Sequence, residues 1–249
     1  MRVPAFVLSL VFLAFPTGLR SQKPPAVTGT ISAAQILEKY IEATGGLDAH
    51  KRLQTLIGQG EFGLYLPHPL GSYTFSYKAP SNDVLQMDHI SHGSSWIGRH
   101  NDRPFRRVAV GGTWMINGAG IEIIEQDWRS LLDWDFSREY SKIELIGRSQ
   151  VDKRWAFALR LTPRQGDPVV RFYDQETGLL VRMDQVQHYQ FSKNQREMVY
   201  AVETYFRDYT NRDGLKLPQM ITISRPGGDL LFDVARVRPN VQIDDAVFR

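Results

Sequence analysis

The stretch PVVRFYDQETGLLVRMDQVQHYQF, residues 168–191, decides the fold class. Its two ends, 168–174 and 179–191, are typical of β-strands, and the segment Asp174-Gln175-Glu176-Thr177-Gly178 between them carries turn chemistry. A turn this short joins antiparallel neighbours, because parallel strands need a crossover of about a dozen residues or more. The stretch therefore predicts an antiparallel meander, which argues against a doubly wound nucleotide-binding fold.

Strand patterns continue in both directions from this stretch. Phe62, Leu64 and Leu66 share one face of a predicted strand, and Tyr73, Phe75 and Tyr77 share one face of the next. Further strands are predicted over 83–90, 94–100, 105–110, 113–117, 142–150, 154–162, 197–209, 216–224 and 229–238, with tight turns at 211–214 and 226–229. A sheet of about eleven antiparallel strands tends to curl.

Two helices are predicted before the sheet and a third inside it. Ser32 and Gln35 have the spacing of a capping box, Gly45-Gly46 ends that helix, and a short helix follows over 48–56. Between 121 and 137 one apolar stripe at helical spacing comprises Ile124, Trp128, Leu131, Leu132 and Phe136. If the curled sheet stays open, helices can fill its concave side. The predicted fold is a mainly β, unclosed half-barrel with two or three helices across the concave face.

The N-terminal segment has the layout of a secretory signal. Met1-Arg2 precedes an apolar run from Val3 to Phe15, which Pro16 and Gly18 then interrupt. We expect a signal peptide over 1–21, a flexible tether over 22–30 and one domain over 31–249, so the protein is expected to be exported. The alternative is a retained amphipathic or membrane anchor.

Composition excludes several kinds of chemistry. The 249-residue chain has no cysteine, so disulfides, thiolate metal sites, a cysteine nucleophile and a lipid-modified cysteine are all ruled out. The formal net charge of +3 includes Arg2 and Arg20, and without residues 1–20 the basic and acidic residues nearly balance. The remaining arginines are interspersed with acids rather than clustered in a basic stripe, which argues against a nucleic-acid partner.

Four segments together resemble a known family. They are Ala43-Thr44-Gly45-Gly46 at the end of the first helix, ETGLLVR over 176–182, ETYFRDY over 203–209 with DGLKLP over 213–218, and NVQIDDAVF over 240–248. Over about residues 32–248 the chain is similar to exported bacterial proteins related to outer-membrane lipoprotein-sorting carriers, the LolA-like group.

The resemblance implies a function as well as a fold. An unclosed barrel capped by helices would hold acyl chains of a lipoprotein or lipid in an apolar cavity while they cross the periplasm. Shielding is needed because each exposed CH₂ of an acyl chain costs about 0.8 kcal/mol. The implied protein is a soluble periplasmic carrier and not an enzyme. It needs no cofactor, and a membrane-associated protein would donate or accept its cargo.

The alternation of apolar residues in the sequence indicates which residues would line such a cavity. The candidates on the first hairpin are Phe62, Leu64, Tyr73, Phe75 and Tyr77, and those on the inserted helix are Trp128, Leu131 and Leu132. The alternative is that these side chains form a solid core, which is the commoner use of aromatic stripes in β proteins.

No motif predicts a metal or a catalytic residue. Asp88, His89, His92 and His100 lie close in sequence, but a third clearly spaced metal ligand is missing. The segment 93–96 lacks the nucleophile elbow, and the glycines at 111–112 and 118–120 miss the dinucleotide fingerprint.

The paired carboxylates likewise predict no chemistry. Asp133 and Asp135 would not face each other on a helix and are expected to solvate a helix end, and Asp244-Asp245 is expected to be a surface turn. Two alternatives to a carrier stay open. One is an envelope interaction or sensor module with a filled interior, and the other is a hydrolase using a buried histidine, with His188 the first candidate.

Overall fold

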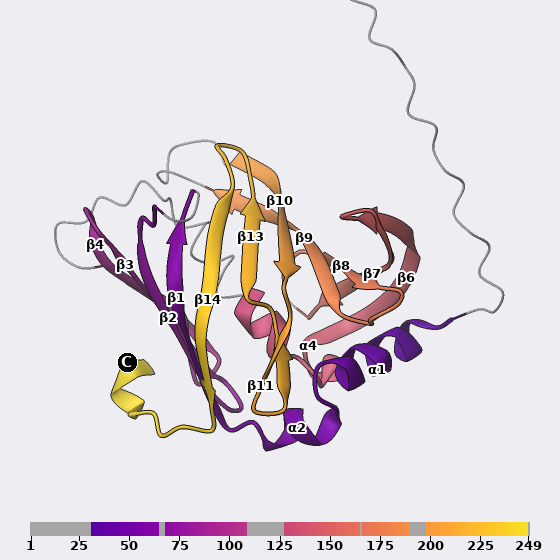
Figure 1. Cartoon of the computed structure of the whole chain (residues 1–249), viewed down its shortest axis with the longest axis horizontal. Coiled ribbons are helices and arrows are strands. Elements are labelled where there is room, and N and C mark those ends of the chain that lie inside the picture. Colours follow the sequence, from indigo (N-terminus) through magenta and orange to yellow (C-terminus); the bar gives the residue numbers. More distant parts are fainter. Residues whose placement is uncertain (1–30, 65–67, 109–126, 165, 190–197, 249) are drawn as a thin grey trace, which may run out of the picture. The chain divides into compact units, whose positions relative to one another are not determined.

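A computed structural model of the chain describes residues 31–64, 68–108, 127–164, 166–189 and 198–248 (Figure 1). The predicted signal peptide and tether, the predicted strand 113–117, Leu66 and the first part of the inserted helix with Ile124 lie outside these residues. Residues from Ile31 onward form one compact unit.

One antiparallel sheet dominates the described residues. Its twelve strands lie in the order β5-β4-β3-β2-β1-β14-β13-β10-β9-β8-β7-β6, so nearly every strand pairs with its neighbour in sequence. The edge strands β5 and β6 do not pair with each other, and the sheet is open. The bounds are β1 Thr55–Gly63, β2 Gly71–Lys78, β3 Asn82–His89, β4 Gly93–His100, β5 Arg103–Val108, β6 Tyr140–Val151, β7 Arg154–Pro163, β8 Val169–Asp174, β9 Leu180–Tyr189, β10 Met198–Arg207, β13 Met220–Ser224 and β14 Leu230–Pro239. The predicted mainly β, unclosed fold is therefore confirmed.

Two-residue turns join several neighbouring strands. Asn101 and Asp102 between β4 and β5, and Asp152 and Lys153 between β6 and β7, all have positive φ. Two successive left-handed residues give the turn type whose twist matches that of an antiparallel pair. The same geometry at 213–214 closes a separate small hairpin of β11 (Thr210–Arg212) and β12 (Leu215–Leu217).

Three predicted boundaries are wrong. The second helix, α2, spans Leu47–Arg52 and ends before Leu56, which belongs to β1 and pairs with Tyr77 and Pro239. The pairing of β1 with β2 on one side and with β14 on the other therefore overrides the helical pattern that the sequence shows at Leu56. The strand predicted over 216–224 is two strands, because Pro218 has no N–H to donate to a ladder. The first strand ends at Gly63, so Leu64 is not part of it.

The first helix, α1 (Ala33–Ala43), confirms the predicted capping box. The Ser32 side chain accepts from the Gln35 backbone, and the Gln35 side chain accepts from the Ser32 backbone. Ile36, Leu37 and Tyr40 face the core.

Two other short helical elements are α4 (Phe136–Glu139) and η1 (Asp245–Phe248). Among the described residues, no helix is long and apolar enough to cross a membrane.

The chain crosses from one edge of the sheet to the other between β5 and β6. Residues 127–132 on this crossing are helical, and we call them the lid helix. Trp128 stacks on Phe75 of β2, while Asp127 bonds to Thr204 of β10 and to Gln185 of β9. A helix this short touches both halves of the sheet only because the sheet curls around it. Figure 1 shows the strands turning steadily in direction from β1 towards β6, as the twist of a large sheet requires.

Candidate functional site

The predicted cavity-lining residues lie mainly in the interior beneath the lid helix. Six are buried: Phe62, Tyr73, Phe75, Trp128, Leu131 and Leu132. Tyr77 is partly buried against the same core cluster. Leu64 is 53% exposed, because it follows the last residue of β1. The structure therefore brings seven of the eight residues together.

Trp128 fills the centre of this interior. Its ring lies 5.1 Å from that of Phe75 at an interplanar angle of 13°, and 6.4 Å from that of Tyr73. The indole also rests on Gly58 of β1, where an added Cβ would lie only 2.6 Å from the Cη2 atom of Trp128. Glycine at this strand position gives the indole room to approach the sheet. That this interior also opens to hold a ligand stays a prediction.

A buried arginine holds the lid helix to β8 and to the start of β6. Arg171 has 0% exposure, and its Nη2 donates to Ser130 Oγ at 2.9 Å, to Asp133 Oδ2 at 2.9 Å and to Tyr140 Oη at 2.5 Å. Burial opposes its charge, but Tyr140, Tyr173 and Asp133 hold the pKa of Arg171 well above its ordinary value. The guanidinium is therefore charged. We call Arg171, Ser130, Asp133 and Tyr140 the arginine latch.

A buried carboxylate marks the other end of the lid helix. Asp127 has 0% exposure, accepts from Thr204 Oγ1 at 3.0 Å and from Gln185 Nε2 at 3.3 Å. Burial raises its pKa to about 8, although these two hydrogen bonds and the charge of Arg171 oppose the shift. Near neutral pH Asp127 is therefore mainly protonated.

Helix α1 adds a further contact to the lid helix. The Tyr40 hydroxyl donates to the carbonyl oxygen of Leu131 at 3.1 Å, and the Tyr40 ring packs edge-on against Tyr173. The lid helix is thus held through polar contacts at its two ends and in its middle, while its apolar side chains fill the interior.

Sequence reasoning missed Arg171 and Asp127, and it misplaced Asp133. Arg171 lies between Val169 and Tyr173 on the inward face of β8, so a charge in an alternating apolar strand was the available signal. The prediction that Asp133 solvates a helix end is wrong, because its carboxylate pairs with the buried Arg171. Asp135, in contrast, is exposed at the start of α4.

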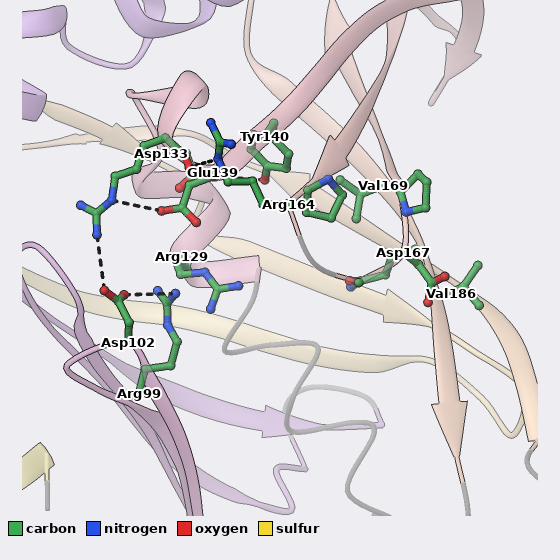
Figure 2. Close-up of a pocket in the computed structure, with 15 residues that line it drawn as sticks. Arg99, Asp102, Arg129, Asp133, Glu139, Tyr140, Arg164, Asp167, Val169 and Val186 are labelled. Atoms are coloured by element: carbon green, nitrogen blue, oxygen red, sulfur yellow. Dashed lines mark hydrogen bonds and ion pairs between the residues drawn. The ribbon is translucent and has the colours of Figure 1, made fainter.

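A charged pocket of about 630 Å³ lies beside the lid helix (Figure 2). Arg99 and Arg138 both pair with Asp102, at 4.0 and 3.8 Å, and Arg138 also pairs with Glu139 at 3.7 Å. Because Asp102 follows β4 and Arg138 lies on α4, one of these pairs joins segments next to opposite edges of the sheet. The lining residues are Arg99, Asp102, Arg129, Asp133, Arg138, Glu139, Tyr140, Pro163, Arg164, Gly166, Asp167, Pro168, Val169, Gln185 and Val186.

The histidines occupy separate surroundings. His89 and His92 approach each other with 2.9 Å between their Nδ1 atoms. In the part of the chain that the structure describes, no three His, Asp or Glu side chains lie close enough together to hold a metal ion.

His188 Nε2 lies 2.7 Å from Asp167 Oδ2, but the His188 side chain is 43% exposed rather than buried. His50 is buried against Thr44 Oγ1 at 2.8 Å, and burial lowers its pKa.

These features define a class of protein: a curled, unclosed antiparallel sheet whose inner face is covered by a helix held through buried polar contacts. The fold is similar to that of a solved LolA superfamily protein, as the resemblance in the sequence predicted. A crystal structure of a LolA superfamily protein from Nitrosomonas europaea is similar over 88% of this chain and 98% of that chain, with a TM-score of 0.53 and 14% identity.

Two further solved structures are similar to this chain. A DUF1329 family protein from Desulfovibrio piger has a TM-score of 0.47 and 16% identity over 88% of this chain and 98% of its own. A putative outer membrane lipoprotein-sorting protein domain from Vibrio parahaemolyticus has a TM-score of 0.44 and 11% identity over 85% and 97%. No protein-family model and no curated protein matches the sequence.

Proposed function

We propose that this chain is an exported, periplasmic, non-enzymatic carrier or binding protein that shields acyl chains of a lipoprotein or lipid under the lid helix. The proposal rests on which elements supply the side chains at the centre of the apolar interior. The apolar interior is filled by Trp128, Leu131 and Leu132 of the lid helix as well as by the sheet. Moving this one element would uncover apolar surface on both halves of the sheet.

The energetics favour exchange of the lid side chains for an acyl chain. Burying a large apolar side chain contributes about 1.5–3 kcal/mol, and burying an acyl chain contributes about 0.8 kcal/mol per CH₂. A chain entering beneath the lid helix would therefore replace the burial that Trp128 loses. The hydroxyl and carboxylate groups that hold the lid can bond to water once they are released.

Delivery needs a second protein or a membrane that competes for the acyl chains. We propose that a membrane-associated donor or acceptor protein meets the lid side of the molecule, and that the chain is released there. The exported location rests on the secretory layout of residues 1–21.

The direct test uses the protein without residues 1–21 and a fluorescent fatty acid. We expect saturable binding, bound lipid in native mass spectrometry and a change in tryptophan emission on addition of lipid. Trp128→Phe should remove most of the emission change, whereas Trp155→Phe should keep it, because Trp155 lies on β7 and contacts Arg148 instead of the lid helix. If no lipid is detected and the emission does not change, the carrier proposal is wrong.

One observation favours a second candidate function. The described interior is packed with side chains, as expected of an envelope interaction or sensor module on the same scaffold. In that case the purified protein would bind no lipid in either assay, and Trp128→Asp would affect stability alone.

A further inference from the structure

Two buried polar side chains interrupt the apolar inner face of the sheet beside the lid helix. Thr204 of β10 is 0% exposed and Gln185 of β9 is 4% exposed. In the ladder Thr204 pairs with Met183 and Gln185 pairs with Val202, so the two polar residues are diagonal neighbours on one face. Met183 and Val202 belong to the apolar core cluster. An acyl chain under the lid helix would therefore meet this polar pair within an apolar surface.

Both polar side chains bind the same carboxyl group of the lid helix. The Thr204 hydroxyl donates to Asp127 Oδ2 at 3.0 Å, and the Gln185 amide donates to Asp127 Oδ1 at 3.3 Å. Asp127 directly precedes Trp128, whose ring stacks on Phe75 of β2. One movement of the lid helix would therefore uncover the polar pair and the apolar surface together.

An alkyl chain alone cannot replace Asp127 at this place. A buried donor that loses its acceptor still bears the cost of its removal from water, and an alkyl chain offers no acceptor. A site built to form hydrogen bonds therefore discriminates against a ligand that lacks the matching group. The part of a ligand that covers Thr204 and Gln185 needs a hydrogen-bond acceptor.

The chemistry of the site favours an uncharged acceptor. The Thr204 hydroxyl and the Gln185 amide carry no charge, and Arg171, whose charge acts on Asp127 from β8, already donates to Asp133. Burial raises the pKa of Asp127 to about 8, so near neutral pH the site holds a carboxyl group that is mainly protonated. The carbonyl oxygen of an ester or an amide is an uncharged acceptor, and the acyl chains of lipids and lipoproteins are attached through such groups.

The polar pair also adjoins a cavity. Gln185 lines the charged pocket of about 630 Å³ beside the lid helix, as does Asp133. A carbonyl group bound to Thr204 and Gln185 would have this pocket on one side and the apolar interior on the other. The polar remainder of an acylated molecule would then lie in the pocket, outside the apolar interior.

We propose that Thr204 and Gln185 bind the carbonyl oxygen of an acyl ligand, and that Asp127 occupies this site while the lid helix covers the interior. The inference rests on the proposed function and adds two features to it. The ligand needs an uncharged carbonyl group at the start of its chain, and the tail of the chain points towards Phe75.

The test compares two ligands that differ in the carbonyl group alone. Methyl decanoate and decyl methyl ether have the same chain length, and each competes with a fluorescent fatty acid for the protein without residues 1–21. We expect Thr204→Val and Gln185→Leu each to lower the affinity for the ester, relative to the ether, by about tenfold, because a hydrogen bond is lost. The ratio of the two affinities is decisive, since a looser lid helix would change both affinities alike.

Thr222→Val is the matched control. Thr222 of β13 is also buried, but it lies on the opposite face from Ile221 and Ile223, which belong to the core cluster. There its hydroxyl accepts from Arg207 Nη1 at 3.2 Å. The same chemical change at this position should leave the ratio of the two affinities unchanged.

A second measurement follows Asp127 itself. Once displaced into water, this carboxyl group returns to its ordinary pKa of 3.8 and releases most of a proton at pH 7, whereas methyl decanoate does not titrate. Calorimetry in two buffers with different heats of ionisation detects the release. Asp127→Asn should abolish it.

Each other outcome has a definite meaning. If Thr204→Val and Gln185→Leu leave the ratio unchanged, the carbonyl site is wrong, while the carrier proposal stands. If the ester binds without proton release, Asp127 does not leave its site, and the inference is overturned as well. If neither ligand nor the fluorescent fatty acid binds the unaltered protein, the carrier proposal is wrong and the carbonyl site falls with it.

Discussion

Arg171 shows how one residue can couple the lid helix to the sheet. Its charge is fully buried, and it is satisfied in part by Ser130, Asp133 and Tyr140, which come from the crossing segment and from β6. Desolvating a charge is costly, so each partner matters more than an exposed one would. The predictions at this scale therefore concern side chains that touch the lid helix.

Gly58→Ala should loosen the lid helix from beneath. The new Cβ would meet the indole of Trp128 at 2.6 Å, and overpacking of this kind costs about 1–3 kcal/mol. We expect lower stability in urea and tryptophan emission shifted to longer wavelength. In a Trp128→Leu background the same glycine change should cost much less. An equal cost in both backgrounds would contradict the contact.

Asp127 should make stability fall as pH rises. Its ordinary pKa is 3.8 and its folded pKa is about 8, so between these values the folded state binds more protons than the unfolded state. The stabilising contribution is complete below about pH 4 and is lost as pH rises to about 8, by at most about 1.4 kcal/mol per pH unit. Asp127→Asn should remove this dependence in urea titrations at pH 5 and pH 8. Asp152→Asn, an exposed control, should keep it.

At the scale of elements, side-chain hydrogen bonds tie the lid helix to the sheet and to α1. This helix lies on the connection between two edge strands, and its attachments are side-chain contacts from β8, β9, β10 and α1. Strands inside the sheet are instead bonded along both sides. Elements with few backbone ties open at lower free energy than the core strands.

Breaking the arginine latch should therefore lower the free energy of unfolding much more than changing a nearby exposed carboxylate does. Asp133→Asn removes the charge that pairs with buried Arg171, and removing one partner of a buried pair costs about 3–5 kcal/mol. Asp135→Asn changes an exposed carboxylate two residues away and should cost less than about 0.5 kcal/mol. Urea unfolding measures both. Similar costs for the two variants would show that the latch contributes little.

At the scale of the whole molecule, the open sheet makes lid movement possible without breaking the ladder. The edge strands β5 and β6 carry the two ends of the crossing segment, and the central strands β1, β14 and β13 are paired on both sides. Displacing the lid helix would leave these pairings intact. A closed barrel would lack this freedom.

Hydrogen exchange should detect this difference. When a lipid is added, we expect faster amide exchange in peptides covering 127–140 and unchanged protection in β1, β13 and β14. Mass spectrometry of peptic fragments gives the measurement, with the lipid-free protein as reference. Changes spread across the whole sheet, or none at all, would contradict a lid that moves as a separate element.

The sequence by itself determined most of the secondary structure and the antiparallel pairing of neighbouring strands, because strand alternation, two-residue turns and helix capping are properties of neighbouring residues. It also brought seven of the eight chosen apolar residues into one interior. Only the tertiary structure decided what holds the lid helix, since Arg171 and Ser130 are 41 residues apart and Asp127 and Thr204 are 77 apart. Contacts at such separations leave no local period, because they depend on how the sheet curls around the crossing segment.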